Sequence, residues 1–242
     1  MYLKAAFEGK GEIIAWIERE LEGLPVNGVA RRWRQEIYLE TPFDLSGEKT
    51  SVVERGSVAF WPPGRALCFF YGYSQPYSPV IKLGSIVGSP DLLSSIEEGL
   101  EVHLATYVDY GKEGELARAL RESGFKSASH SWEEEEKVGV LVEGVDSRVG
   151  VEVDVNEDGY YSQTQSLTFF DNSPPTMAFF KTLAGELAPT GIRLDVNEEG
   201  YIILSCFSQS FDELVRDLKR LLSAYVYAER AMVTFYSVRR PV

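Results

Sequence analysis

Hydrophobic and polar positions in the first half of the chain alternate in short runs that are separated by glycine and proline. The run YLKAAF alternates as a strand does. Four later runs are rich in β-branched and aromatic residues: QEIYLETP, SVVERGSVAFW, RALCFFYG and SPVIKLGSIVG. Several short strands with turn signals between them, up to about residue 110, predict a closed or nearly closed β-barrel.

Residues 12–21 interrupt this strand pattern. Their apolar positions recur at helical spacing, at Ile13, Ile14, Ile17 and Leu21, and the turn-rich run LPVNG follows them. This spacing predicts an amphipathic helix over residues 12–21 that ends at the turn.

Helical and strand-like patterns alternate in the second half of the chain. Residues 113–123 predict a short helix that Gly124 stops, and Ser173 followed by Pro174 predicts the start of a second helix. A capping box formed by Ser210 and Glu213 opens a third, longer helix. The predicted apolar faces are Leu116 and Leu120 in the first helix, Met177, Phe180, Ala184 and Leu187 in the second, and Phe211, Leu214, Leu218, Leu221 and Tyr225 in the third.

The order of these elements is helix, three strands, helix, two strands and a long helix. Strands that are joined by hairpins and separated from the helices in this way are typical of an antiparallel sheet covered by helices. The second half is therefore predicted to be an α+β domain with an antiparallel sheet and flanking helices.

The hexapeptide DVNEDG at residues 154–159, and its near repeat DVNEEG at residues 195–200, have the spacing of the first half of an EF-hand calcium loop. Such a loop requires a bidentate Glu at its twelfth position and a helix on each side. Gln165 and Cys206 occupy that position, and alternating apolar residues flank both motifs. Each motif is therefore predicted to form the tip of a β-hairpin, and no metal site is assigned.

Composition and charge limit the classes of partner. The formal net charge of -13 disfavours nucleic acid, and Arg31, Arg32 and Arg34 form only a short basic cluster. Cys68 and Cys206 lie in apolar runs, so we expect two buried thiols that pack as small hydrophobic residues, with a disulfide between them as the alternative. No apolar run approaches the roughly 18 residues of a membrane span, and the first residues lack the apolar centre of a signal peptide. We therefore expect a cytoplasmic protein that does not enter a membrane.

Three stretches of the first half carry a resemblance to a known family: RRWRQEIYLETP, GSVAFWPPGRALCFFYG and SPVIKLGSIVG. They closely resemble the cyclophilin-like barrel domain of uncharacterised archaeal and bacterial proteins. In that domain a Trp, an Asp/Glu-Glu-Ile-Tyr run, a Gly-Asp-Val/Ile-Ala-Tyr/Trp run, Pro-Pro-Gly and Phe-Phe-Gly recur in this order. Arg34 and Gln35 depart from the pattern, because relatives often carry Gly and Asp there. The resemblance covers residues 2–110.

The second half is similar in its element order to type III secretion chaperones and YbjN-like regulators. Those proteins use their sheet and helices to dimerise or to hold a partner protein. Together the two resemblances imply a mainly-β cyclophilin-like barrel over residues 1–111, followed by an α+β domain over residues 112–242. Residues 112–236 would then serve a protein partner or a homodimer. Most residues of the apolar stripe on the last helix are expected instead to pack within the core of the same chain.

The PPG stretch supplies the first candidates for a binding site. Pro63 and Gly64 suit the two central positions of a type II turn, which would present Trp61 and Arg65 side by side. A Trp offers a flat apolar face, and an Arg can hold a carboxylate through two hydrogen bonds.

Other polar and aromatic residues extend this candidate site. If Glu36, Tyr38 and Tyr71 line the same barrel mouth, the result is a small mixed pocket for a small molecule or a peptide. The complete set of ligand-binding candidates is Trp61, Arg65, Glu36, Tyr38, Tyr71 and Arg34. The same aromatic residues could instead fill the barrel, with Arg65 and Glu36 forming a structural ion pair.

Catalytic and cofactor motifs are missing from the sequence: it has no GxSxG, no Walker loop, no HExxH and no dinucleotide fingerprint after a strand. No cofactor is therefore expected. The sequence favours a non-catalytic binding protein. Peptidyl-prolyl isomerisation is one alternative, although the FHR-type and FxMQGGD-type stretches of genuine cyclophilins are absent. A structural or assembly protein that acts through its C-terminal domain is the other.

Overall fold

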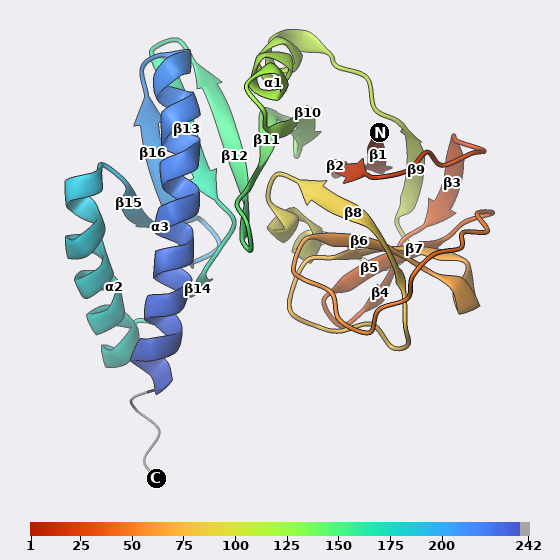
Figure 1. The fold of residues 1–242 in the computed structure, drawn as a ribbon, viewed down its shortest axis with the longest axis horizontal. Helices are drawn as coiled ribbons and strands as arrows, with labels where there is room; N and C mark the ends of the chain where they lie inside the picture. Colours follow the sequence, from red (N-terminus) through yellow and green to blue (C-terminus); the bar gives the residue numbers. More distant parts are fainter. Residues whose placement is uncertain (238–242) are drawn as a thin grey trace. The chain divides into compact units, whose positions relative to one another are not determined.

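The computed structural model describes residues 1–237, which form two compact units: Met1–Leu141, and the described residues from Val142 onward (Figure 1). The last residues of the expected second domain, 238–242, lie outside the described residues. None of the helices within residues 1–237 is both long enough and apolar enough to cross a membrane.

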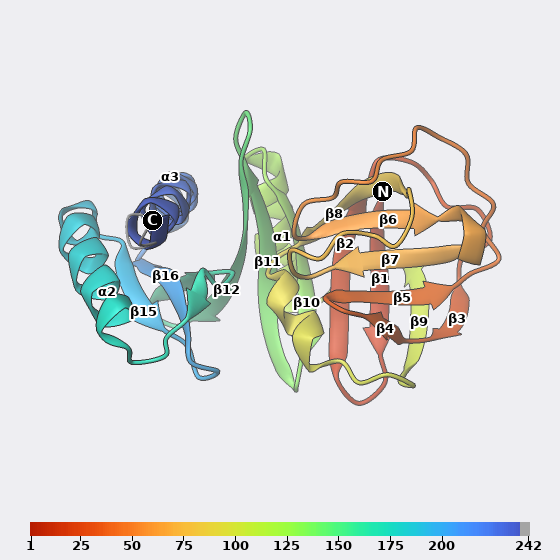
Figure 2. The same ribbon diagram turned by 90° about the horizontal axis from the view of Figure 1, so that it is seen from below.

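A curled antiparallel sheet makes up most of the first unit (Figure 2). One path through it runs β10-β2-β8-β6-β7-β5-β4, and a second runs from β2 through β1 and β9 to β3. The strands of this sheet are β1 (Tyr2–Phe7), β2 (Gly11–Ile17), β3 (Val26–Val29), β4 (Arg31–Trp33), β5 (Glu36–Glu40), β6 (Ser57–Trp61), β7 (Ala66–Phe70), β8 (Ile81–Val87), β9 (Glu101–Thr106) and β10 (Lys126–Trp132).

The two ends of this sheet curl toward each other where β3 approaches β5. A Cβ atom added at Gly28 of β3 would lie only 3.0 Å from the Leu39 side chain of β5. The sheet therefore encloses a core, as the run of short strands predicted. Two short 3₁₀ helices, η1 (Pro62–Gly64) and η2 (Pro90–Ser95), interrupt the strands.

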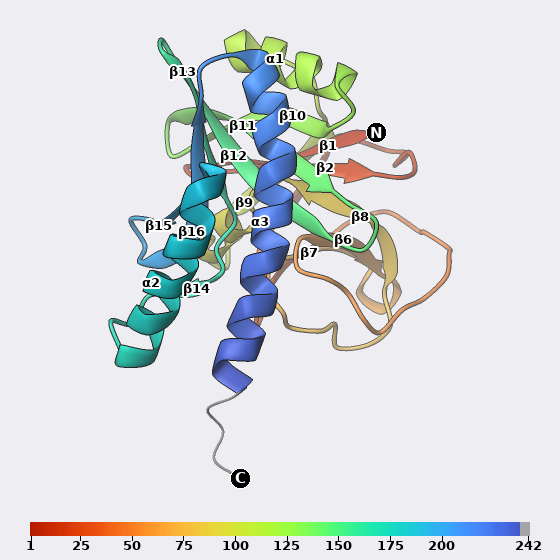
Figure 3. The ribbon, with the colours of Figure 1, turned by 60° about the vertical axis from the view of Figure 1, so that its left-hand side comes forward.

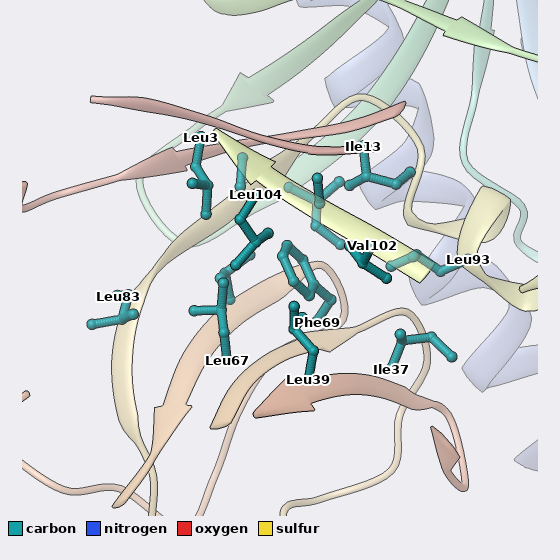
Figure 4. Packing of buried hydrophobic residues seen from close by; sticks show 14 of the residues in the cluster. Leu3, Ile13, Ile37, Leu39, Leu67, Phe69, Leu83, Leu93, Val102 and Leu104 are labelled. Carbon is teal, nitrogen blue, oxygen red and sulfur yellow. The ribbon is translucent and has the colours of Figure 1, made fainter. Parts of the chain in front are cut away.

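The core of the first unit comes from alternate residues of most of its strands. Figure 4 shows Leu39, Leu67 and Phe69 gathered with Leu104 and Val102 in this interior. Because side chains alternate between the two faces of a strand, the residues between these positions point out of the barrel. This alternation decides where the candidate site lies.

The helix predicted over residues 12–21 is wrong, because residues 11–17 form strand β2 instead. Ile13, Ala15 and Ile17 pack in the barrel core, whereas Ile14 belongs to a separate apolar cluster with Trp16 on the opposite face. Since β2 is buried on both faces, its apolar residues do not alternate with polar ones. A short run of this kind cannot be told from a helix by periodicity.

The first unit continues beyond the boundary that we expected at residue 111. It also contains α1 (Gly111–Glu122), β10 and most of β11 (Glu135–Glu143). Strand β10 pairs with β2 through Trp132 and Gly11, and α1 packs on β10. These contacts hold residues 111–141 against the barrel strands, so the compact units divide after Leu141.

The second unit is a smaller antiparallel sheet with two helices beside each other (Figure 3). Strand β13 pairs with β12 and β16, while β14 and β15 also pair with β16. Helix α3 packs on β12, β13 and β16, and α2 packs on β15 and α3. The elements are β12 (Arg148–Asn156), β13 (Gly159–Thr164), β14 (Thr168–Phe169), α2 (Pro174–Leu187), η3 (Ala188–Thr190), β15 (Arg193–Val196), β16 (Tyr201–Ser208) and α3 (Phe211–Ser237).

The number of strands between the first two helices differs from the prediction. Four full strands and the two-residue β14 lie there, where the pattern predicted three. The sequence of β10, KSASHSW, is rich in serine and gives little apolar signal. Ser127 and Ser129 are nevertheless buried, and the Ser127 hydroxyl donates to the carbonyl of Ala117 at 2.7 Å.

Both acidic hexapeptides form the predicted hairpins. β12 and β13 pair up to Asn156 and Gly159, and β15 and β16 pair up to Val196 and Ile202. Gln165, at the twelfth position of the first motif, is buried and structural. Its side chain accepts from the backbone N–H of Gly150 at 3.0 Å and donates to the Tyr225 hydroxyl at 3.1 Å.

The predicted face of α3 is confirmed except at Phe211, and that of α2 is corrected except at Leu187. Leu214, Leu218, Leu221 and Tyr225 of α3 are fully buried, and Phe211 is half-buried. In α2, Leu187 is buried as predicted, and the other buried residues are Thr176, Phe179 and Leu183. The face is rotated because the ring of Phe179 packs on Phe235 of α3, at 5.7 Å between centroids.

The packing of β2 against β8 gives a direct test of the barrel. A Cβ atom at Gly84 would lie 1.9 Å from the carbonyl oxygen of Trp16. We expect Gly84→Ala to lower the free energy of unfolding by more than about 2 kcal/mol, because two paired backbones would have to separate. Urea unfolding followed by circular dichroism measures this loss.

A matched control for this substitution is Gly185→Ala. Gly185 lies in α2, and a Cβ atom there would meet nothing within 4 Å. That variant should be stabilised by about 0.5–1 kcal/mol, because alanine favours the helix. Equal effects of the two substitutions would contradict the close approach of β2 and β8.

Candidate functional site

The outer face of β4, β5, β7 and β6 brings together several of the predicted site residues. In the strand register Trp33 lies opposite Glu36, which lies opposite Phe70. The adjacent row contains Tyr38, Cys68 and Ala59. All these side chains point away from the barrel core, because Ile37, Leu39, Leu67 and Phe69 occupy the inward positions.

A second apolar layer covers this outer face. Val53, Ala59, Cys68, Phe70 and Val80 form a buried cluster, and Tyr38 and Trp61 pack against it half-buried. The structure therefore places Glu36, Tyr38 and Trp61 on the outside of the barrel rather than at its mouth.

The loop of residues 72–80 is fixed over this layer by two glutamines. The Gln35 side-chain oxygen accepts from the backbone N–H of Tyr73 at 3.0 Å. Gln75 accepts from the N–H of Val53 at 2.9 Å and donates to the Val53 carbonyl at 3.1 Å. The loop is thereby held in one position relative to β5 and residues 50–53.

Two neighbouring residues of this loop reach two different tryptophans. The ring of Tyr77 meets Trp33 edge-to-face, with 5.9 Å between centroids and an angle of 85°. Ser78, the next residue, accepts a hydrogen bond from the indole N–H of Trp61 at 2.7 Å. We call the surface formed by Trp33, Tyr38, Trp61 and Tyr77 the aromatic surface.

Glu36 is the buried polar group of this surface. It is only 6% exposed, and its polar contact is the thiol of Cys68. Within residues 1–237 it pairs with no lysine or arginine, so the alternative of a structural ion pair with Arg65 is not found. Burial raises the pKa of the Glu36 carboxyl above its usual value, and the hydrogen bond from Cys68 only partly offsets this.

Cys68 is unsuited to act as a nucleophile. Its side chain is fully buried, and burial together with the charge of Glu36 raises the pKa of the thiol well above its usual value. The thiolate, which is the reactive form, is therefore disfavoured at neutral pH. Cys68 and Cys206 are both buried free thiols, as the sequence predicted.

The PPG stretch adopts a different turn from the predicted one. Pro62–Gly64 form the 3₁₀ helix η1, and the left-handed residue is Arg65, with φ 47°, rather than Gly64. Glycine is required at position 64 for another reason: a Cβ atom there would lie 2.2 Å from the Trp61 ring.

Arg65 has a structural position. Its guanidinium donates to the carbonyls of Pro42 at 2.7 Å and Phe43 at 3.2 Å, and its own carbonyl accepts from the backbone N–H of Thr41 at 2.8 Å. These bonds fasten the segment after β5 to the start of β7. Two of the guanidinium N–H groups that we expected to hold a ligand carboxylate therefore already donate to these backbone carbonyls.

Tyr71 also lies apart from Glu36, because its ring packs with the barrel core. Its hydroxyl donates to the carbonyl of Arg34 at 3.0 Å and accepts from the Arg32 guanidinium at 2.8 Å. Burial raises the pKa of Tyr71, and the charge of Arg32 partly offsets the rise. Tyr71 thus fixes the backbone at the tip of the β4–β5 hairpin.

Arg34, at that hairpin tip, has φ 54°, and its guanidinium carbon lies 5.4 Å from the centroid of the Trp33 ring. The departure from the Gly-Asp pattern therefore puts a cation on an exposed aromatic face. Sequence reasoning missed Trp33 and Tyr77. The only signal in the sequence was the presence of aromatic residues in two otherwise polar stretches. These are RRWRQ, where Trp33 precedes the candidate Arg34, and YSQPYSP, which contains Tyr77.

A shallow hollow on the opposite side of the barrel is less suited to binding. It lies over β1, β3 and β9, where His103 and Asn27 share a hydrogen bond of 2.7 Å. Both residues are exposed, and the hollow contains no buried polar group among its lining residues.

Comparisons with known proteins identify the larger part of the first unit. Residues 3–105 match the family described as Cyclophilin-like. The hypothetical protein AF2241 from Archaeoglobus fulgidus is 31% identical over 44% of this chain and 95% of its own, with a TM-score of 0.38. McbB, solved in complex with tryptophan, is 15% identical over 50% of this chain and 54% of its own, with a TM-score of 0.37. No curated protein matches the chain.

The family match confirms the resemblance that the sequence motifs carried, and residues 3–105 form a cyclophilin-like domain. The similarity of the second half to secretion chaperones and YbjN-like regulators stays a prediction.

The raised pKa of Glu36 predicts how stability depends on pH. A carboxyl whose pKa is higher in the folded chain favours folding most below its usual value of 4.5, and this contribution is lost as the pH rises through the folded pKa. Glu36→Gln removes the ionisation. As the pH rises from 4 to 8, the free energy of unfolding of the natural chain should therefore fall progressively relative to that of the variant.

Glu40→Gln is the matched control, because Glu40 lies on the same strand and face but its side chain is 68% exposed. Its difference from the natural chain should not follow the same course with pH. Chemical unfolding at a series of pH values measures both. A Glu36→Gln difference that stays constant with pH would show that the carboxyl ionises normally in the folded protein.

Proposed function

We propose that this cyclophilin-like domain is a non-catalytic binding module, which holds a small molecule or a peptide on the aromatic surface. The exposure of large aromatic rings in fixed positions is the main support. Trp33 is 40% exposed and Tyr77 is 78% exposed, yet the two rings pack edge-to-face on each other. Exposed aromatic side chains that are already ordered lose little entropy when a ligand covers them.

The polar groups beside the rings also support binding. Glu36 lies directly across the strand pair from Trp33, and side chains at such positions are about 5 Å apart at their Cβ atoms. A surface of apolar rings with one placed polar group is typical of sites that orient a small ligand. Of the sequence candidates, we assign Glu36, Tyr38, Trp61 and Arg34 to this surface.

Arg65 and Tyr71 are assigned a positioning role instead. Their polar atoms bond to the backbone of Pro42, Phe43 and Arg34, so they hold the segments that carry the site. Prolyl isomerisation receives no support from Arg65, because its guanidinium is tied to these carbonyls. The role of residues 112–236 in dimerisation or partner binding stays a prediction.

The test is an amide NMR shift screen of the labelled chain against pooled metabolites and short peptides, some ending in a carboxylate and some containing proline. We expect shifts to concentrate on residues 31–38, on residues 73–80 and on the indole signals of Trp33 and Trp61. Trp33→Ala should abolish these shifts and leave the melting temperature nearly unchanged, because the ring contributes little to the core.

Trp61→Ala serves as the contrasting variant. It should weaken binding and also lower the melting temperature, since Trp61 packs against the buried outer cluster and covers Gly64. If no compound moves signals on the aromatic surface, or if Trp33→Ala binds as well as the natural chain, the site is not there. A prolyl isomerase assay of the same sample tests the catalytic alternative.

A further inference from the structure

We infer that the aromatic surface selects an alkylammonium group, with Glu36 as its counter-charge and the Trp33 ring as its apolar contact. This inference rests on the proposed function and names the chemical class of the ligand. The ammonium could come from a free alkylamine or from the side chain of a lysine in a peptide.

The first support is that Glu36 is buried without a cation. Three other shielded carboxylates of the first unit have one: Glu12 pairs with Lys4 at 2.9 Å, Asp109 pairs with Arg121 at 2.5 Å, and Asp91 pairs with Arg55. A buried carboxylate without a cation is costly, because the protein does not replace the water that would solvate it. A positively charged ligand would supply the counter-charge that the folded chain does not provide for Glu36.

The second support is the geometry around Trp33. Its ring already receives a cation, because the Arg34 guanidinium lies 5.4 Å from the ring centroid. Aromatic faces attract ammonium and guanidinium groups through the negative charge of their π electrons. Trp33 and Glu36 are directly paired across β4 and β5, so an ammonium held at the Trp33 ring lies beside the strand position of Glu36.

Other ligand classes fit these residues less well. A carboxylate or phosphate would bring a second negative charge beside Glu36, and like charges in a shielded place repel strongly. A metal ion needs several ligands, and the described residues contain no group of three or more His, Cys, Asp or Glu side chains that could hold one. A primary ammonium offers both charge and N–H donors, and its alkyl chain can cover the rings.

Arg34 would affect cationic and anionic ligands in opposite ways. For a cationic ligand, Arg34 is a competitor, because its guanidinium occupies the Trp33 face and repels a second positive charge. For an anionic ligand, the same residue would be an attraction. Removing its charge therefore has opposite effects on the two classes of ligand.

The experiment titrates four matched probes into the labelled chain and follows amide and indole signals by NMR. The probes are n-butylammonium chloride, Nα-acetyl-lysine-N-methylamide, n-butanol and sodium butyrate. We expect saturable shifts at residues 31–38 and at the Trp33 indole with one or both ammonium probes, and none at the same concentrations with butanol or butyrate. Binding of the lysine derivative alone would identify a peptide side chain as the source.

Two substitutions and a control test the residues. Glu36→Gln should weaken ammonium binding by at least about tenfold, because a charged hydrogen bond is lost. Glu40→Gln, which changes an exposed carboxyl on the same face, should leave the affinity within about twofold. Arg34→Gln should make ammonium binding tighter, because it removes the guanidinium that competes for the Trp33 ring. Melting curves establish that each variant is folded.

Three results would overturn the inference: butyrate or butanol binding as well as the ammonium probes, unchanged binding by Glu36→Gln, or ammonium binding by Arg34→Gln that is no tighter than that of the natural chain. If compounds of another class bind the aromatic surface and neither ammonium probe does, this inference fails and the proposed binding module stands. If neither the metabolite and peptide screen nor these probes move signals there, the proposed function itself fails.

Discussion

The pleat of strands β5, β7 and β6 is the constraint on which the rest of the first unit depends. Successive residues alternate between the barrel core and an outer layer, so one set builds stability and the other builds a surface. Phe69 lies fully buried within the barrel, while its neighbours Cys68 and Phe70 support Trp61 and Tyr38 from below. Because these strands are buried on both faces, the outer residues have fixed positions that loops alone would not give them.

The sequence predicted most strands and helices, and it failed where the environment rather than the local pattern decides. The strands β5 to β8 and the helix α3 follow from residue type and spacing. The assignment of β2 failed because Ile13 and Ile14 face different apolar clusters, which only the neighbouring strands create. The serine-rich β10 gives little apolar signal, and it is held by its pairing with β11 and by the bond from the Ser127 hydroxyl to the Ala117 carbonyl.

The candidate site could be predicted only in part, because the sequence shows its residue types but not the register in which its strands pair. Glu36, Tyr38 and Trp61 do share a surface. Shifting the pairing of a strand by one residue would reverse the face of each of its side chains, and no motif specifies that pairing. The internal bonds of Arg65 and Tyr71 were equally hidden, since their partners are backbone carbonyls.

The loop that carries Tyr77 and Ser78 contacts both tryptophans of the aromatic surface. One residue touches Trp33 and the next touches Trp61, while Gln75 holds the loop a few residues earlier. Tyr77 and Ser78 are adjacent, so a single peptide link lies between the contact at Trp33 and the contact at Trp61. The two indole rings, which belong to strands far apart in the sequence, thus share one short stretch of backbone as their common support.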